Sequence, residues 1–264
     1  MERDEPDLRI NQVLPGVYHI QDNLGVCMTL LCGSRSAMLV DTGYGISDVS
    51  TVIRSITQLP LKVILTHGHH DHCMGVRWFD HVSMFPEDHA DFATYTGEYT
   101  RRRILTSADD KGQPVADDYL TAQLAMPETL SEQVVDLGGI TTQIIHCPGH
   151  TPGSCCVYVK EHALMLTGDN WNPCTWLFFP AALGIREYLK NMRKLLELPF
   201  SHVLCSHQPV LFSRDVPDAF FTALTEDAIA NAHPVTISPY DAIHTVQADL
   251  PMNQLIVFDR DKAC

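Results

Sequence analysis

The chain has 264 residues and a formal net charge of −14 at pH 7. Hydrophobic residues make up 45% and charged residues 19% of it, which is ordinary for a globular protein and excludes a disordered chain. The acidic charge argues against a protein that follows the phosphates of nucleic acid, because such proteins present a basic stripe.

The first ten residues, MERDEPDLRI, are charged, so they contain no apolar leader for secretion. No apolar stretch approaches the roughly 18 residues that a membrane span requires. The cysteines number nine, an odd count, and form no CxxC pair, which argues against a disulfide framework. We therefore expect a cytoplasmic protein that acts on a small molecule, with neither nucleic acid nor membrane as a partner.

The first part of the chain alternates short apolar runs with a helical pattern, which is typical of α/β architecture. Residues 26–33 and 36–43 predict two consecutive strands joined by a Gly-Ser turn. Residues 46–59 place apolar side chains at helical spacing. Residues 61–67 predict a buried strand that leads into a histidine cluster, and a brief strand is expected at 81–85.

Residues 86–128 are polar and show no strand alternation. We expect a helical excursion over the surface, in a position to act as a lid. It contains the one tight run of cations, Arg101, Arg102 and Arg103. A solvated helix face is the simpler interpretation of this run, and a contact with an anion is the alternative.

The remaining chain predicts further strands and two helices. Strands are expected at 141–147, 154–160, 162–169 and 201–207, with short ones near 242–247 and 254–259, and helices at 184–198 and 216–231. The sequence contains no repeat, low-complexity block or linker, so we expect one domain over residues 1–264.

Polar side chains follow the carboxyl ends of five predicted strands. They are Asp41, the cluster His67, His69, Asp71 and His72, and then His150, Asp169 and His207. Because ligands are held in the crevice beyond the strand ends of such sheets, we expect these side chains to meet in one place.

The spacing inside the histidine cluster suits two metal ions. Residues two apart in an extended segment point to the same side, so His67 and His69 can bind one ion together. A bend into a helix near Asp71 would direct Asp71 and His72 towards a second ion.

The pattern H-x-H-x-D-H would occur by chance about 0.003 times in a chain of this composition, which disfavours a polar surface turn. Between the candidate ligands, Gly68 is expected to give the backbone freedom to turn tightly, and His70 to face away.

Five motifs in this order, VDTG, THGHHDH, CPGHTPGS, LTGD and CSH, resemble the metallo-β-lactamase superfamily over about residues 17–210. The resemblance implies a four-layer αββα sandwich, a combination of α/β and α+β features, with a metal site at one edge of its two sheets. The implied ligands are His67, His69 and His150 for the first metal, and Asp71, His72 and His207 for the second, with Asp169 bridging both. Asp41 matches the position that orients a metal-bound imidazole.

A ligand set of imidazoles and carboxylates suits zinc, so two Zn²⁺ ions are expected, although iron or manganese would accept the same donors. Two such ions would share a water, lower its pKa and present a hydroxide as the nucleophile. Asp71 is the candidate general base besides its role as a ligand. The expected reaction is hydrolysis, and a homodimer is expected because family members are often dimers.

Subfamily features narrow the substrate. Metallo-β-lactamases proper generally lack the bridging aspartate, so Asp169 counts against antibiotic cleavage. The sequence after Asp169, GDNWNPCTW, lacks the tyrosine of quorum-quenching lactonases. CPGHTPGS resembles glyoxalase II-like thioesterases, but no glutathione-binding helices are recognisable. Ribonuclease Z-like enzymes resemble the metal site, but the acidic charge argues against RNA.

We therefore expect a small ester, thioester or lactone as the substrate. Two alternatives remain open, a phosphodiesterase and an iron-dependent oxidoreductase similar to persulfide dioxygenases. The oxygenase would use one iron held by two histidines and an aspartate, and the complete second-metal set argues against it.

Four aromatic residues lie close behind Asp169, namely Trp171, Trp176, Phe178 and Phe179. They are interpreted with equal weight as core packing or as an apolar wall beside the metals, for a hydrophobic or aromatic part of the substrate. Tyr95, Tyr99, Arg101 and Arg102 are candidates for the opposite wall, with surface positions as the simpler interpretation.

Cys73 and Cys147 adjoin the motifs, but we expect buried core cysteines because the ligand set is complete without them. Cys155 and Cys156 are expected to point to opposite faces of one strand. The other histidines are expected to be structural or exposed; they are His19, His81, His89, His146, His162, His202, His233 and His244.

Overall fold

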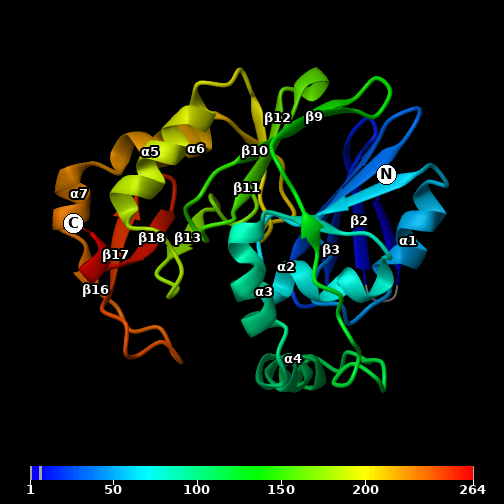
Figure 1. The fold of residues 1–264 in the computed structure, drawn as a ribbon. Helices are drawn as coiled ribbons and strands as arrows, with labels where there is room; N and C mark the ends of the chain where they lie inside the picture. Colours follow the sequence, from blue (N-terminus) through cyan, green and yellow to red (C-terminus); the bar gives the residue numbers. More distant parts are fainter. Residues whose placement is uncertain (1, 6–7, 264) are drawn as a thin grey trace.

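The computed structural model describes residues 2–5 and 8–263. Two sheets pack face to face and helices cover their outer faces, so the predicted αββα sandwich is confirmed (Figure 1). The first sheet has eight strands in the order β1 to β8. The second has six strands in the order β15-β14-β12-β11-β10-β9.

The first sheet comes from the N-terminal half of the chain. Its strands are β1 (Glu2–Glu5), β2 (Leu8–Leu14), β3 (Val17–Asp22), β4 (Cys27–Cys32), β5 (Ala37–Val40), β6 (Leu61–Ile64), β7 (Ser83–Met84) and β8 (Glu128–Thr129). The strands β1 to β5 pair antiparallel and β5 to β8 pair parallel. The parallel step from β5 to β6 needs a crossover, which α1 (Val49–Ile56) supplies.

The second sheet comes from the second half of the chain, between residues 133 and 213. Its strands are β9 (Gln133–Asp136), β10 (Thr141–His146), β11 (Cys155–Val159), β12 (Leu164–Leu166), β14 (His202–Leu204) and β15 (Phe212–Ser213). The helices α5 (Ile185–Leu196) and α6 (Asp215–Ala223) cover its outer face (Figure 1). The buried stripe of α5 repeats every three or four residues, as the sequence predicted.

Alternating side chains of the central strands fill both faces of each sheet. In β11, Cys155 and Val157 pack between the two sheets, whereas Cys156 and Tyr158 pack towards the outer helices. This alternation lets one short strand connect two hydrophobic layers. The prediction that the two adjacent cysteines point to opposite faces is confirmed.

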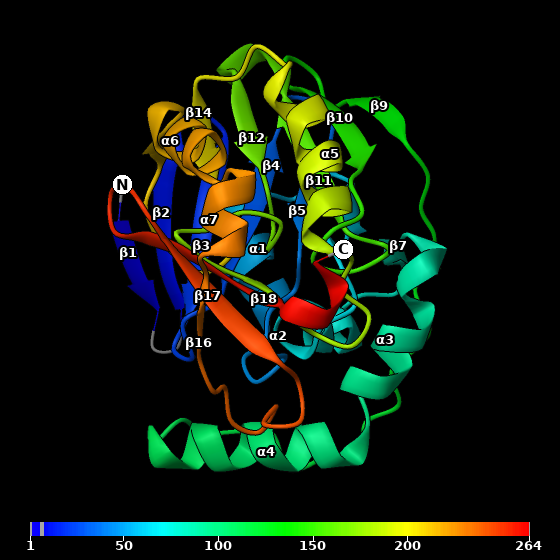
Figure 2. The same ribbon diagram turned by 90° about the vertical axis from the view of Figure 1, so that its left-hand side faces the viewer.

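A third sheet of four strands lies beyond the sandwich (Figure 2). It contains β13 (Cys174–Leu177), β16 (His233–Pro234), β17 (Thr245–Leu250) and β18 (Gln254–Asp259), in the order β13-β18-β17-β16. The predicted strand at 254–259 is confirmed, and the one expected near 242–247 lies at 245–250. The strand β13 was not predicted, because its pairing with β18 joins segments far apart in the sequence.

The excursion over 86–128 is helical only in its first half. After η2 (Pro86–Asp88) come α3 (His89–Tyr95) and α4 (Glu98–Asp110), and residues 111–127 contain turns without helix or strand.

The predicted helix at 216–231 is two helices, α6 and α7 (Glu226–Ala230). Thr225 separates them because its hydroxyl accepts the amide of Ala228 and begins the new helix.

Four short helical segments complete the described chain: α2 (His70–Cys73), η1 (Met74–Trp78), η3 (Lys160–His162) and η4 (Arg260–Lys262). Within residues 2–5 and 8–263, no helix has the length and apolar character needed to cross a membrane.

Candidate metal centre

The seven predicted ligands lie together at one edge of the sandwich. They come from the loops that follow β6 in the first sheet and β10, β12 and β14 in the second. The ligand atoms fall into two groups, in each of which all of them lie within 4.8 Å of one another: His67, His69 and His150, and then Asp71, His72, Asp169 and His207.

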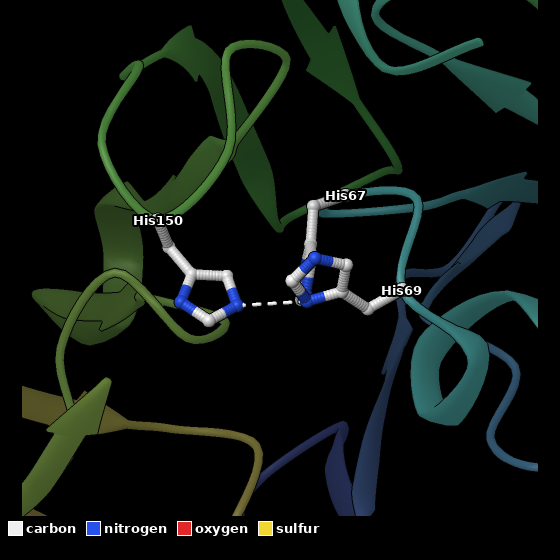
Figure 3. Close-up of side chains that lie close together, drawn as sticks. All are labelled: His67, His69 and His150. Carbon is white, nitrogen blue, oxygen red and sulfur yellow. Dashed lines mark hydrogen bonds between the residues drawn. The ribbon is translucent and has the colours of Figure 1, made fainter. Parts of the chain in front are cut away.

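The first group consists of three buried imidazoles (Figure 3). His150 Nε2 lies 2.9 Å from His69 Nδ1. The ring of His67 lies edge-on to both, with centroids 4.7 Å from His69 and 4.8 Å from His150. Two ring nitrogens at hydrogen-bonding distance share one proton, and a cation can take the place of that proton.

The second group combines two carboxylates with two imidazoles. Asp169 Oδ2 accepts a hydrogen bond from His207 Nε2 at 2.9 Å and lies 3.5 Å from His72 Nε2. Asp71 Oδ2 lies 3.6 Å from His72 Nε2 and 3.5 Å from His207 Nε2. Asp169 Oδ2 is also 3.7 Å from His150 Nε2 in the first group, so this oxygen lies between the two groups.

Several buried polar atoms of these seven side chains have no hydrogen-bond partner within the described part of the chain. They are Nε2 of His67 and His72, Oδ1 of Asp169, and Nε2 of His69, whose Nδ1 is the nitrogen that faces His150. Each unpaired buried polar atom costs about 1–3 kcal/mol, so a cluster of them calls for a ligand that satisfies several at once. Imidazole nitrogens and carboxylate oxygens are donors for divalent zinc, iron and manganese. The residues therefore fit divalent metal ions.

The opposite ring nitrogens of these histidines are held by neighbouring groups. His72 Nδ1 donates to Asp41 Oδ2 at 3.0 Å, and His67 Nδ1 lies 3.0 Å from the hydroxyl of Thr66. His150 Nδ1 donates to the carbonyl of Trp176 at 2.6 Å. Fixing one nitrogen of an imidazole sets its tautomer and directs the other nitrogen to the metal, as expected for Asp41.

Asp41 adopts a left-handed backbone conformation with φ of 66°, which is uncommon for a residue with a side chain. Its carboxylate accepts the amide and the hydroxyl of Thr66 as well as His72 Nδ1. Such strain is retained where the surrounding contacts determine the position of a functional group.

The electrostatics of the two groups differ. Burial and the neighbouring imidazoles lower the pKa of His67 and His69 well below the usual value, so both are neutral and able to act as ligands. Burial also acts to lower the pKa of His72, but Asp169, Asp71 and Asp41 outweigh it and raise that pKa. The proton that these carboxylates hold on His72 is one that a cation would displace.

Asp88 connects the two ligand loops and was missed by the sequence analysis. Its buried carboxylate accepts the amide of Gly68 at 2.9 Å, the hydroxyl of Thr151 at 2.6 Å and the amide of Gly153 at 2.5 Å. Burial raises the pKa of Asp88 to about 6. A Cβ at Gly68 would meet the amide nitrogen of Phe92 at 2.8 Å, so the glycine allows close packing and does not adopt the positive φ of a tight turn.

Asn170 is a second positioning residue without a sequence signal. Its side-chain oxygen accepts the backbone amide of His150 at 3.0 Å, and its amide donates to the carbonyl of Cys147 at 2.7 Å. It follows Asp169 directly, so one short loop contributes both a candidate ligand and a support for His150.

The predicted core positions of Cys73 and Cys147 are confirmed, since both are buried in hydrophobic clusters.

His70 contributes no ligand atom to either group, which agrees with its expected place as the spare histidine of the motif. Its ring lies 5.6 Å from that of Tyr44 and 6.0 Å from that of Tyr95, and its Nδ1 is 3.9 Å from Asp71 Oδ1. The helical turn of α2 places it on the side of Asp71, where its side chain is 32% exposed.

The aromatic residues after Asp169 divide between core and site. Trp171 and Phe178 are fully buried, as core packing predicts. The ring of Phe179 lies 4.7 Å from that of His69 and 5.2 Å from that of His150. Trp176 is 37% exposed, and its ring lies 6.2 Å from that of Phe179. The apolar wall beside the metal centre therefore contains Phe179 and not the whole set.

Of the four residues on the excursion that were candidates for the opposite wall, only Tyr95 lies beside a candidate ligand. The ring of Tyr95 lies 4.4 Å from that of His69, whereas Tyr99 is 72% exposed. Arg101 is buried, and its guanidinium donates to the carbonyls of Thr96, Tyr119, Leu120 and Ala122. A solvated position is therefore wrong for Arg101. It is confirmed for Arg102, which pairs with Glu98 at 2.6 Å on the exposed side of α4.

A two-sheet sandwich with paired His/Asp groups at one edge defines a class of metal-binding αββα proteins. The chain belongs to the metallo-β-lactamase superfamily, whose family model matches residues 23–207.

Curated relatives include thioesterases. The acyl-coenzyme A thioesterase MBLAC2 of Gallus gallus is 24% identical over an alignment of 187 positions that covers 64% of this chain and 66% of the relative. The atrochrysone carboxyl ACP thioesterase nsrC of Aspergillus novofumigatus is 28% identical over an alignment of 160 positions that covers 59% of this chain and 40% of the relative. The chain thus spans between 40% and 66% of the length of these two relatives.

Solved structures share the fold. TTHA1623 in a di-iron-bound form has a TM-score of 0.53 at 22% identity and covers 74% of this chain and 93% of its own. The B3 metallo-β-lactamase BLEG-1 also has a TM-score of 0.53 at 22% identity and covers 73% of this chain and 91% of its own. At this identity the likeness concerns the fold alone.

Proposed function

We propose that the chain is a dinuclear metal-dependent hydrolase that cleaves a small thioester substrate. The observation that carries the proposal is the position of Asp169 Oδ2, within 3.7 Å of His150 Nε2 on one side and 2.9 Å of His207 Nε2 on the other. The thioesterase names of the relatives favour a thioester over the ester and lactone that the sequence left equally open.

His67, His69 and His150 would hold the first ion, and Asp71, His72 and His207 the second, with Asp169 shared. When bound, two ions supply an activated water at neutral pH and polarise the substrate carbonyl. The donor set suits zinc, which we retain as the proposed metal, while the di-iron form of a structural neighbour makes iron the alternative.

The side chains of the chain itself orient the substrate and handle the proton. Burial acts to raise the pKa of Asp71, but His72, His70 and His207 outweigh it and lower that pKa to about 2. Asp71 is therefore ionised at neutral pH and can accept a proton from the attacking water. As the water oxygen bonds to the carbonyl carbon, the C–S bond breaks, and the thiolate takes up that proton, giving a carboxylic acid and a thiol.

Metal content and a substrate panel test the proposal together. Purified protein loaded with zinc is expected to contain two ions per chain and to hydrolyse acyl thioesters faster than carboxylic esters, lactones or phosphodiesters. His207→Ala is expected to retain one ion and to lose at least a hundredfold in kcat/KM, because His207 belongs only to the second group.

The matched control is His202→Ala, a partly exposed histidine in β14, which is expected to keep both ions and its activity. Hydrolysis of none of the substrates by protein with two ions per chain would contradict the proposal. One iron per chain with oxygen-dependent turnover of a persulfide would establish the oxygenase instead. Phosphodiester cleavage alone would establish the phosphodiesterase.

Two further expectations belong to this proposal. The described cysteines form no disulfide with one another, which supports a reducing compartment such as the cytoplasm. A homodimer remains the proposed assembly, and sedimentation of the zinc-loaded protein tests it.

A further inference from the structure

The connection between β16 and β17, residues 235–244, leaves the third sheet and extends towards α4 (Figure 2). It lies outside residues 23–207, which the family model matches. Tyr240 in this connection is only partly exposed. The C-terminal chain therefore brings an aromatic side chain back to the sandwich from a segment that the family model does not include.

Tyr240 contacts the aromatic residues beside the metal centre. Its ring lies 5.5 Å from that of Phe178 and 5.4 Å from that of Phe179, edge-on to both. Its phenol lies close enough to that of Tyr95 on α3 for each to influence the pKa of the other. We call Tyr95, Phe179 and Tyr240 the aromatic cluster.

The aromatic cluster adjoins the first ligand group directly. Tyr95 and Phe179 both place their rings against His69, at 4.4 Å and 4.7 Å between centroids. The second group is more open, because the side chain of His207 is 35% exposed, whereas His150 is buried. Apolar faces therefore surround one side of the centre while the other side meets solvent.

We propose that the aromatic cluster is the acyl-binding subsite of the enzyme and that Tyr240 makes it selective for bulky apolar or aromatic acyl groups. This inference rests on the proposed thioesterase function. Aromatic rings bind planar or branched apolar groups through stacked and edge-on contacts. The methyl of an acetyl group makes few such contacts and therefore adds little binding energy. The neighbouring phenols of Tyr95 and Tyr240 bring the C-terminal connection next to the excursion, so the acyl group would lie between two segments that are far apart in the sequence.

The test compares two small uncharged substrates, the S-benzoyl and S-acetyl thioesters of N-acetylcysteamine. In zinc-loaded Tyr240→Ala, the ratio of kcat/KM for benzoyl over acetyl is expected to fall about five- to tenfold relative to the wild type. Tyr240→Phe keeps the ring and is expected to keep this ratio within about twofold. A merely structural role would lower both kcat/KM values by the same factor and leave the ratio unchanged, which would overturn the proposal.

Val134→Ala is the control, since Val134 is 66% exposed on β9 and has no part in the centre. Its ratio is expected to equal that of the wild type. Circular dichroism of each variant shows that the fold is retained, and Tyr240→Phe keeps the comparison informative where Tyr240→Ala does not fold.

A binding measurement separates this inference from the proposed function. Calorimetric titration uses the non-hydrolysable thioether S-benzyl-N-acetylcysteamine, and Tyr240→Ala is expected to raise its Kd about five- to tenfold. Binding that depends on Tyr240, without hydrolysis of any thioester, would support the subsite and contradict the thioesterase. Hydrolysis of both thioesters with an unchanged benzoyl-to-acetyl ratio in Tyr240→Ala would support the thioesterase and contradict the subsite.

Discussion

Asp88 brings three donors from two loops onto one buried carboxylate. Gly68 belongs to the loop of His67 and His69, and Thr151 and Gly153 belong to the loop of His150. Because all three neighbours donate hydrogen bonds, they favour the ionised form of Asp88, which can only accept them. Burial acts in the opposite direction and raises the pKa of Asp88 to about 6. The relative position of the two halves of the first ligand group therefore depends on this residue.

Asp88→Asn is expected to weaken both the fold and metal binding. The amide nitrogen of the new side chain would face one of the three donors, which costs about 1–3 kcal/mol in the free energy of unfolding. Displacing a ligand loop is expected to lower zinc affinity about 10- to 100-fold, as measured by competition with a chromophoric chelator. Asp91→Asn, at a half-buried carboxylate one helical turn further on, is the control. Equal zinc affinity in the two variants would contradict the positioning role.

His19 makes a separate prediction about pH. It is buried in β3, where its neutral ring donates from Nε2 to the carbonyl of Gln208 and accepts at Nδ1 from the hydroxyl of Thr29. Burial lowers its pKa from 6.5 to about 4. Because Gln208 adjoins His207, the contact also fixes the loop of a candidate ligand.

Since the folded state disfavours the proton, the unfolded chain binds it first as the pH falls. The contribution of His19 is therefore complete above pH 6.5 and is lost between pH 6.5 and 4, by about 3 kcal/mol in total. Urea unfolding in the presence of a chelator measures this loss. His19→Gln, which has no titration in this range, is expected to show a smaller decrease over the same interval. An identical pH dependence would contradict the assignment.

The residues of the centre that could be predicted are those with a local signature. His67, His69, Asp71 and His72 lie within one short motif, where spacing alone determines which side chains share a face. Asp88 could not be found in this way, because its partner Gly153 is 65 residues away and nothing in its own neighbourhood requires a buried carboxylate.

Elements with strong internal periodicity were predicted well. The stripe of α5 and the fully apolar run of β5 are specified by residues inside each element. Strand β13 has only four residues, and it buries the polar Thr175 while Trp176 is exposed, so its assignment depends on the parallel partner β18. Pairing at such a separation is a tertiary effect that a local pattern does not contain.

The third sheet is expected to unfold together with the sandwich. Ile256 in β18 is fully buried in the same cluster as Leu189 of α5 and Phe220 of α6. Ile256→Ala is expected to lower the free energy of unfolding by about 2–5 kcal/mol while leaving one transition in calorimetry. Val134→Ala on the exposed face of β9 is expected to cost less than about 0.5 kcal/mol. A separate early transition in Ile256→Ala would contradict the proposal of one domain over residues 1–264.

At the scale of the whole molecule, the metal centre connects the two sheets. His67, His69, Asp71 and His72 follow the first sheet, and the other candidate ligands follow the second. Each group draws from both sheets, so bound ions would act as cross-links at this edge of the sandwich. The sequence predicted this convergence from the strand ends, but not the Tyr240 connection that approaches from the third sheet.

Metal removal is therefore expected to destabilise the entire fold and not only the loops. Zinc that is free at 100 times its Kd stabilises the folded state by about 2.7 kcal/mol for each site. Chelation is expected to lower both the Tm and the free energy of unfolding of the wild type. In His207→Ala, which keeps one site, chelation is expected to lower the free energy of unfolding by about half as much. Hydrogen exchange should increase at the edges of both sheets together, because the cross-link belongs to both. Faster exchange in only one of the sheets, or a Tm that does not respond to the chelator, would contradict a centre that binds metal between them.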